Sequence, residues 1–159
     1  MKRAQDIKIS CVVPCHNEAA NIITFLRDLH RTITAITHQF EIIIIDDGSE
    51  DNTAQMAIHD SKVTGIKLLR LSRNFGKELA ITAGLEHSQG DVTIIIDADF
   101  QHPIELIPTF IAKWLEGYEM VYAVRETRED ESYLKRTFTK FFYKLNEFVA
   151  EVNIPPNAG

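Results

Sequence analysis

The stretch Thr93-Ile94-Ile95-Ile96-Asp97-Ala98-Asp99 predicts both the fold class and the position of a site. A run of β-branched residues without polar alternation is typical of a central parallel strand that is covered on both faces. Ligands of open α/β sheets bind just beyond the carboxyl ends of such strands, where Asp97 and Asp99 stand. Two neighbouring carboxylates repel each other unless a cation lies between them, and Mg²⁺ shares carboxylate and phosphate oxygens. The first hypothesis is a metal-bound phosphate or diphosphate; the alternative is that Asp99 only caps the following helix.

Strand and helix patterns alternate on both sides of this stretch. We expect strands over residues 7–13, 40–45, 66–71, 92–96 and 120–124, and helices over 18–37, 78–88 and 103–116, with a short helix ending near 60. Repeated β-α-β units with short loops favour a parallel, doubly wound arrangement. The predicted fold class is therefore α/β, with a mostly parallel central sheet and helices on both faces.

The composition limits the classes of function. The chain has 159 residues and a formal net charge of -6, which allows one domain with a real core and disfavours nucleic acid as a partner. Cys11 and Cys15 do not have the spacing of a common zinc or redox motif, so we expect free thiols in a reducing, cytosolic setting. We see no signal peptide and no apolar run of about 18 residues that would cross a membrane.

The last segment has a different character. Over residues 133–149, apolar side chains recur at helical spacing and basic side chains interrupt them. The apolar positions are Leu134, Phe138, Phe141, Leu145 and Phe148, and the basic ones are Lys135, Arg136, Lys140 and Lys144. This mixture suits a helix in a membrane interface. It equally suits a helix docked on the sheet with a solvated basic face, and the pattern leaves both alternatives open.

Polar loops follow the ends of the first four predicted strands, at residues 14–18, 46–49, 72–77 and 97–99. Each loop alone has an ordinary explanation: a turn built on Gly48, surface charges at Arg73 and Lys77, or helix electrostatics at Glu18. Together they can border one crevice, where acids, an amide and cations suit a nucleotide. No glycine-rich phosphate loop is present, so metal and side chains would have to meet the phosphate charge.

The loop sequences resemble a known family. They are Pro14-x-x-Asn17-Glu18, Asp46-Asp47-Gly48-Ser49-x-Asp51, the stretch 72–77 and Asp97-Ala98-Asp99-Phe100-Gln101-His102-Pro103, with Asn157-Ala158-Gly159 at the end. In this order they are similar to the inverting family-two glycosyltransferases of the GT-A fold, in the branch that transfers sugars to polyprenyl or dolichyl phosphate. The family usually continues past Asn-Ala-Gly with Asp-Phe-Arg and further chain. The sequence therefore looks truncated, which puts the activity of this fragment in doubt.

The resemblance implies a role for particular residues. Those implied to line the nucleoside pocket are Pro14, Asn17, Glu18 and Asp47. Those implied to hold Mg²⁺ or Mn²⁺ on the donor diphosphate are Asp97, Asp99 and Gln101, with Lys77 as a diphosphate or sugar contact. We also expect Arg125, at the end of the fifth strand, and Arg136 to hold an acceptor phosphate; the alternative for both is surface solvation.

The implied activity is a metal-dependent, inverting transfer of a hexose from a nucleoside-diphosphate sugar to a polyprenyl phosphate. Residues 1–125 would form the nucleotide-sugar-binding core, and residues 126–159 an acceptor loop and an amphipathic interfacial helix that meets the membrane surface. The parent protein would work at the cytoplasmic face of a membrane, with this fragment soluble or peripheral. The alternatives are a transferase with a hydroxyl acceptor, a Mg²⁺-binding phosphoacceptor signalling domain, and an inactive nucleotide-sugar-binding fragment.

Overall fold

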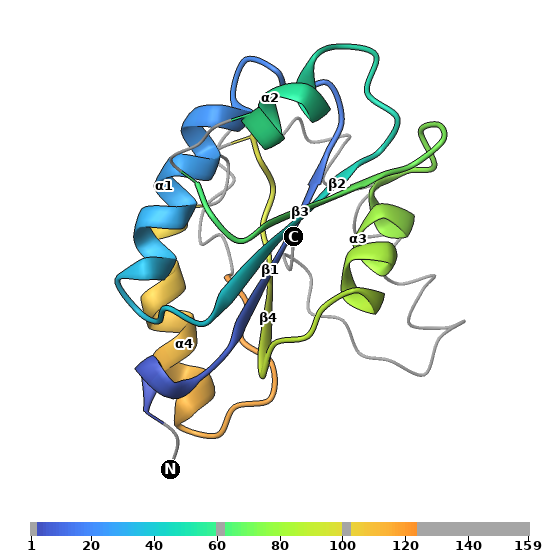
Figure 1. Ribbon diagram of the computed structural model, residues 1–159. Helices are drawn as coiled ribbons and strands as arrows, with labels where there is room; N and C mark the ends of the chain where they lie inside the picture. The colour runs from blue at the N-terminus through green and yellow to red at the C-terminus, as the bar shows by residue number, and fades with distance from the viewer. Residues whose placement is uncertain (1–2, 60–62, 100–102, 124–159) are drawn as a thin grey trace, which may run out of the picture. The chain divides into compact units, whose positions relative to one another are not determined.

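The central element is a parallel sheet of four strands. The computed structural model describes residues 3–59, 63–99 and 103–123. Its strands are β1 (Ile9–Cys15), β2 (Phe40–Asp46), β3 (Ile66–Arg70) and β4 (Val92–Ile95), in the order β3-β2-β1-β4 (Figure 1). All three neighbouring pairs are parallel, and Cys15 at the end of β1 lies level with Asp46 at the end of β2. The carboxyl ends of the strands therefore meet at one edge, as the sequence predicted.

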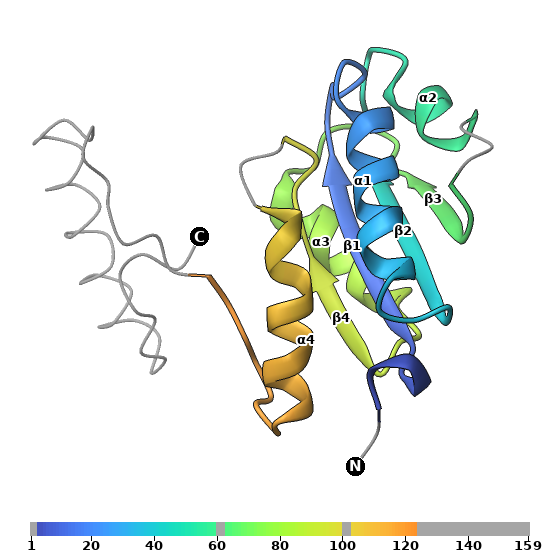
Figure 2. The same ribbon diagram turned by 90° about the vertical axis from the view of Figure 1, so that its left-hand side faces the viewer.

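Helices cover both faces of this sheet, which confirms the predicted fold class. The α-helices are α1 (Ile22–Thr34), α2 (Thr53–His59), α3 (Lys77–Glu86) and α4 (Ile107–Leu115), with short 3-10 turns η1 (Ala4–Asp6) and η2 (Ile104–Leu106). Figures 1 and 2 show α1 and α4 on one face of the sheet and α3 on the other. None of the helices in these described ranges combines the length and apolar character needed to cross a bilayer.

The two faces of the sheet build separate cores because successive strand residues point to opposite sides. Ile9, Cys11 and Val13 of β1 pack in the larger core, to which α1 contributes Phe25 and Leu29. The smaller core lies under α3 and contains Val12, Ile43, Ile45 and Ala80. The five apolar positions expected to face inward from α1 are all buried: Ile22, Phe25, Leu26, Leu29 and Ile33.

Two predictions about the sheet are not met within the described residues. The strand that contains Ile94 was expected to be central and covered on both faces, but among the described strands β1 and β2 are the inner ones, β4 lies at the edge, and Ile95 is 48% exposed. An apolar run in the sequence indicates that a strand is buried. It does not indicate the position of that strand in the sheet, which depends on the strands that pair with it. The fifth strand is also absent through residue 123, because residues 120–123 have no regular structure and Met120 is 79% exposed. Residue 124 lies outside the description.

The start of α1 also differs from the prediction. We expected the helix to begin at Glu18 with Asn17 as its cap, but α1 begins at Ile22 after a turn. Asn17 has a left-handed φ of 57°, and the Glu18 amide donates to Thr53 Oγ1 at 2.8 Å. The first residue of α2 thus holds this turn outside α1. The predicted boundary at residue 125 and the amphipathic helix over 133–149 lie outside the described residues.

A buried polar network fastens the amino ends of the strands. Glu41, which is 4% exposed, accepts hydrogen bonds from Ser10 Oγ at 2.6 Å, the Gln89 amide at 2.8 Å and Lys67 Nζ at 2.6 Å. Burial by itself raises the pKa of Glu41, but these hydrogen bonds outweigh it and lower the pKa from its ordinary value. The ionised carboxylate therefore joins β1, β2, β3 and the loop before β4.

Replacing Glu41 with glutamine should lower the free energy of unfolding at neutral pH by about 1–3 kcal/mol, because the Ser10 hydroxyl and the Gln89 amide both exchange a charged acceptor for a neutral one. The half-exposed Lys67 should contribute little to the loss. Because the pKa of Glu41 is lower in the folded protein than in the unfolded chain, its ionised carboxylate stabilises the fold at pH values above the unfolded-state pKa. This stabilisation is lost as the pH falls through the folded-state pKa. The difference between wild type and Glu41→Gln in urea unfolding should therefore shrink below about pH 4.

The matched control is Glu116→Gln, since Glu116 is half exposed and pairs only with Lys113 one turn away among the contacts described for it. This variant should unfold within about 0.5 kcal/mol of wild type. A constant gap between Glu41→Gln and wild type across the acid range would contradict the ionised network.

Candidate active site

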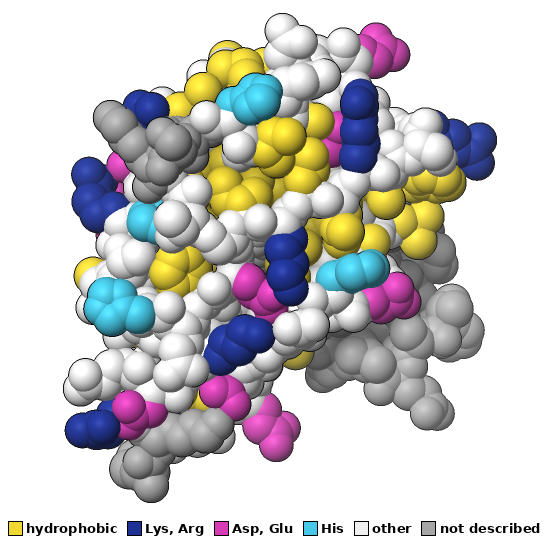
Figure 3. Space-filling model, in the orientation of Figure 1, with side chains coloured by type: hydrophobic (Ala, Val, Ile, Leu, Met, Phe, Trp, Pro, Cys, Tyr) yellow, Lys and Arg dark blue, Asp and Glu magenta, His cyan; other side chains and the backbone are white. Residues whose placement is uncertain are grey.

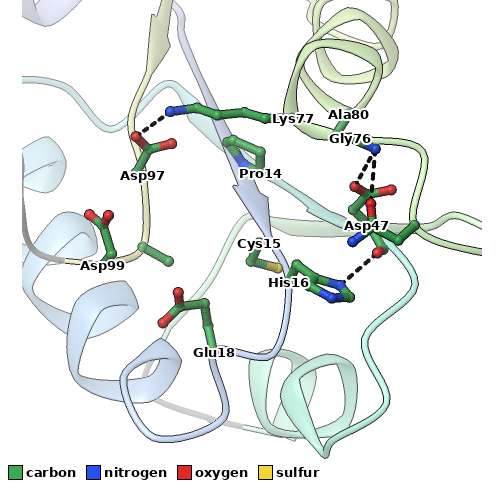
Figure 4. A pocket seen from close by; sticks show the side chains of 12 residues that line it. Pro14, Cys15, His16, Glu18, Asp47, Gly76, Lys77, Ala80, Asp97 and Asp99 are labelled. Atoms are coloured by element: carbon green, nitrogen blue, oxygen red, sulfur yellow. Dashed lines mark hydrogen bonds and ion pairs between the residues drawn. The ribbon is translucent and has the colours of Figure 1, made fainter. Parts of the chain in front are cut away.

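A pocket of about 350 Å³ lies at the carboxyl edge of the sheet. Its walls come from all four predicted loops. The lining residues there are Pro14, Cys15, His16 and Glu18 at the end of β1 and just beyond it, Asp47 after β2, Asn74, Gly76 and Lys77 after β3, and residues 97–99 after β4. Figure 4 shows their side chains gathered around one hollow. The expectation that these four loops border a single crevice is confirmed.

Acidic and basic groups meet across this pocket. Lys77, the first residue of α3, places its Nζ 2.6 Å from Asp97 Oδ2, and both residues line the hollow (Figure 4). Asp99 and Glu18 line it as well. With Asp47, which also lines the hollow, the site combines four carboxylates with one ammonium group, an arrangement that can bind a cation and a polyanion side by side.

The carboxylates of the pocket fit a hard divalent cation whose remaining ligands are water and substrate phosphates. In the ranges that the structure describes, no three His, Cys, Asp or Glu side chains converge closely enough to hold a metal by themselves. Asp97 and Asp99 nevertheless supply carboxylate oxygens on the same wall. Mg²⁺ typically binds through one or two carboxylates and completes its shell with water and substrate phosphates. The third predicted ligand, Gln101, lies outside the described residues.

The residues predicted to line the nucleoside pocket divide into two groups. Pro14, Glu18 and Asp47 line the hollow, whereas Asn17 is not one of its lining residues. The Asn17 amide donates to Ser49 Oγ at 2.9 Å, and its side-chain carbonyl accepts from the Glu50 amide at 2.9 Å. In this structure Asn17 therefore ties the loop after β1 to the loop after β2.

Several lining residues were not predicted, although most stand within the predicted loops. They are Cys15, His16, Asn74, Gly76, Ala80 and Ala98. The His16 ring donates from Nδ1 to the Asp47 carbonyl at 2.8 Å. Burial and the nearby carboxylates, Asp46 first, raise the pKa of Cys15 to about 12, so its thiol stays protonated and is a poor nucleophile. Ala80 could have been found from its place one turn after Lys77.

The two predicted acceptor residues, Arg125 and Arg136, lie outside the described residues. On the face shown in Figure 3, the coloured basic side chains are interspersed with acidic and apolar ones, and the described residues there form no continuous basic patch.

Solved structures of similar fold define the class of protein. A mycobacterial glucosyl-3-phosphoglycerate synthase, in complex with Mn²⁺, UDP-glucose and phosphoglyceric acid, superposes with a TM-score of 0.56 over 70% of this chain and 40% of that chain, at 26% identity. TarS of S. aureus in complex with UDP-GlcNAc gives a TM-score of 0.59 over 79% of this chain and 36% of that chain, at 20% identity, which shows the fold alone. Both neighbours are GT-A glycosyltransferases.

The sequence comparisons then give the family. The model of glycosyl transferase family 2 matches residues 10–159, so the chain belongs to this family and the resemblance seen in its motifs is confirmed. A glycosyltransferase of Synechocystis sp. is 42% identical over 154 residues, covering 96% of this chain and 48% of the relative. A prophage bactoprenol glucosyl transferase homolog of Escherichia coli K12 is 41% identical over 157 residues, covering 96% and 50%. The chain spans about half the length of the curated relatives it matches.

Proposed function

We propose that this chain carries the donor-binding part of a glycosyltransferase that moves a hexose from a nucleoside-diphosphate sugar to a polyprenyl phosphate, with inversion and with a divalent metal. The observation that carries the proposal is the convergence of Asp97, Asp99 and Lys77 in one pocket at the strand ends. The relatives named bactoprenol glucosyl transferases, at 41% identity, favour glucose and a lipid phosphate. Membership in glycosyl transferase family 2 argues against the alternative function of a phosphoacceptor signalling domain.

On the donor side, Pro14 and Glu18 would face the nucleoside. Asp97, Asp99 and Gln101 would hold Mg²⁺ or Mn²⁺ against the diphosphate, and Lys77 would contact the diphosphate itself. When bound, the metal neutralises the charge that builds up on the leaving nucleoside diphosphate. The structural neighbour described with Mn²⁺ and UDP-glucose supports this kind of ligand.

On the acceptor side, the nucleophile would be an oxygen of the lipid phosphate. This oxygen is already anionic at neutral pH, so the reaction needs no strong general base. Arg125 and Arg136 would hold the phosphate, and the basic, aromatic stretch 133–149 would lie at the cytoplasmic face of the membrane. A hydroxyl acceptor would instead require a general base.

A thermal-shift panel of UDP-glucose, UDP-GlcNAc and GDP-mannose, each with Mn²⁺ and with EDTA, tests the donor site. One sugar nucleotide with Mn²⁺ should raise the melting temperature by about 5 °C or more when present at about 100 times its Kd. EDTA should remove most of that shift. No shift with any of the three, or the same shift in EDTA, would refute the metal-dependent donor site.

A further inference from the structure

The ion pair between Lys77 and Asp97 lies where the proposed metal would bind. Lys77 reaches across the pocket from the first turn of α3, and its Nζ lies 2.6 Å from Asp97 Oδ2 (Figure 4). Asp97 and Asp99 line the pocket just beyond the end of β4. An ammonium group and a divalent cation both take carboxylate oxygens as their counter-charge. In this structure Lys77 therefore occupies an oxygen of a proposed metal ligand.

Asp97 is the fixed half of this pair. Its neighbours in the chain, Ile96 and Ala98, are both buried. The Ile96 amide also donates to the Val12 carbonyl at 3.1 Å, which ties this segment to β1. The side chain of Asp97 is only 17% exposed. The carboxylate therefore stays in the wall of the pocket, whichever cation it binds.

Lys77 is the half of the pair that can move. Its backbone is held because α3, which begins at Lys77, packs on the sheet through the buried Ala80. Its side chain is 56% exposed, and a lysine ammonium stands on a flexible four-carbon stem. An ion pair as exposed as this one adds little net stability. The ammonium can therefore leave Asp97 at small cost and still remain within reach of the pocket.

The charges of the pocket determine where the ammonium of Lys77 lies. Among the lining residues, carboxylates outnumber ammonium groups, so the ammonium is drawn to a carboxylate when no other cation is bound. A divalent cation held by Asp97 and Asp99 would repel an ammonium on the same carboxylate. The diphosphate of a donor would then offer Lys77 a new counter-charge.

We propose that Lys77 couples the binding of the metal to the binding of the donor. Its ammonium neutralises Asp97 in the metal-free protein, gives up this carboxylate when a divalent cation binds, and then turns to the donor diphosphate. The metal thus favours the donor in two ways, by its own charge and by the release of Lys77. The metal and the donor rest on the proposed function, but the exchange on Asp97 can be tested with the metal alone.

NMR relaxation of ¹³C-labelled lysine side chains in the full chain, with Mg²⁺ as the only ligand, tests the release of Lys77. Mg²⁺ should make the end of the Lys77 side chain more mobile, because the ammonium loses its fixed partner. Lys113 is the internal control, since it pairs with Glu116 at 2.8 Å and does not line the pocket. Its mobility should stay the same. Unchanged or reduced mobility of Lys77 in Mg²⁺ would overturn the proposal.

Mn²⁺ binding without donor, measured by electron paramagnetic resonance, tests the competition for Asp97. Lys77→Met removes the competing ammonium and should tighten Mn²⁺ binding about tenfold. The matched control is Arg73→Met, which removes a positive charge from the same loop. The Arg73 guanidinium lies 4.8 Å from the centre of the Phe75 ring, and Arg73 does not line the pocket.

Arg73→Met should change Mn²⁺ affinity by less than about twofold, because solvent and salt screen a charge outside the pocket. Equal effects of the two substitutions would show that only net charge matters, and would overturn the proposal. Weaker Mn²⁺ binding by Lys77→Met would overturn it as well, as would a failure of both wild type and Lys77→Met to bind Mn²⁺.

Calorimetry with sugar nucleotides tests the coupling to the donor. In Mn²⁺, Lys77→Met should weaken the donor about tenfold, which is opposite in sign to its effect on the metal. In EDTA, where Lys77 remains on Asp97, the same substitution should cost at most about twofold. A loss of equal size in both conditions would overturn the coupling. If Mg²⁺ and Mn²⁺ act as expected but no sugar nucleotide binds, the proposed function fails while the exchange on Asp97 stands.

Discussion

Alanine in place of Asp97 or Asp99 should abolish the metal-dependent part of sugar-nucleotide binding. Both side chains line the pocket, and fewer than three acidic or histidine ligands converge there among the described residues, so the loss of one carboxylate removes a large share of the protein's hold on the cation. We expect the affinity measured by calorimetry with Mn²⁺ to fall to the value measured with EDTA. Transfer by the complete enzyme should fall by about 10²–10³-fold.

The control for this experiment is Asp28→Ala, which removes an aspartate from α1 and breaks its ion pair with Arg31 outside the pocket. It should bind donor and Mn²⁺ like wild type. Equal donor affinity in Mn²⁺ and in EDTA for the wild-type protein would remove the basis for a metal at these aspartates.

Leucine in place of Gly84 should destabilise the fold by about 3 kcal/mol or more, the largest stability effect that we expect. A Cβ on Gly84 would lie 2.4 Å from Val12 Cγ1 and 2.7 Å from Ile45 Cδ1. Both neighbours are fully buried in the smaller core, and a β-branched valine has few other rotamers. The gain in helix propensity over glycine, about 1 kcal/mol, is too small to offset this overpacking.

Urea unfolding followed by circular dichroism measures the effect. Thr82→Leu is the matched control, because Thr82 is exposed on the same helix and meets no sheet residue at such close range in the contacts described. It should unfold within about 1 kcal/mol of wild type. A Gly84→Leu variant as stable as Thr82→Leu would show that α3 can move away from β1 and β2 without cost.

The sequence predicts that the four loops meet at one pocket, because this prediction depends on only one geometric rule. In a parallel sheet the carboxyl ends of the strands lie at one edge, so loops that are distant in sequence meet there. Asp97 and Lys77, which are 20 residues apart, come within 2.6 Å for this reason. The buried face of α1 was equally predictable, because Phe25, Leu29 and Ile33 follow the helical period.

Features that depend on pairing between distant segments were not predictable. The apolar run at Ile94 and Ile95 does not tell whether β4 pairs with one strand or with two. The apolar residues among 120–123 do not tell whether another strand is available for this segment to pair with. The use of Asp47 as an acceptor for two backbone amides, and of Asn17 as a link to Glu50, also depends on contacts about 30 residues away in sequence. A motif names such residues but does not tell which atoms they bind.

The two polar clusters of this sheet stand at opposite ends of the same strands. Glu41 is the second residue of β2, and Asp47, which lines the hollow, directly follows its last residue, so the group that secures the scaffold and the group at the hollow are separated by the length of this strand. Selection can therefore change the residues that line the hollow while the other end of the sheet keeps its stability. A fold arranged in this way tolerates changes in its pocket residues more readily than a fold in which the same cluster both stabilises the sheet and lines the pocket.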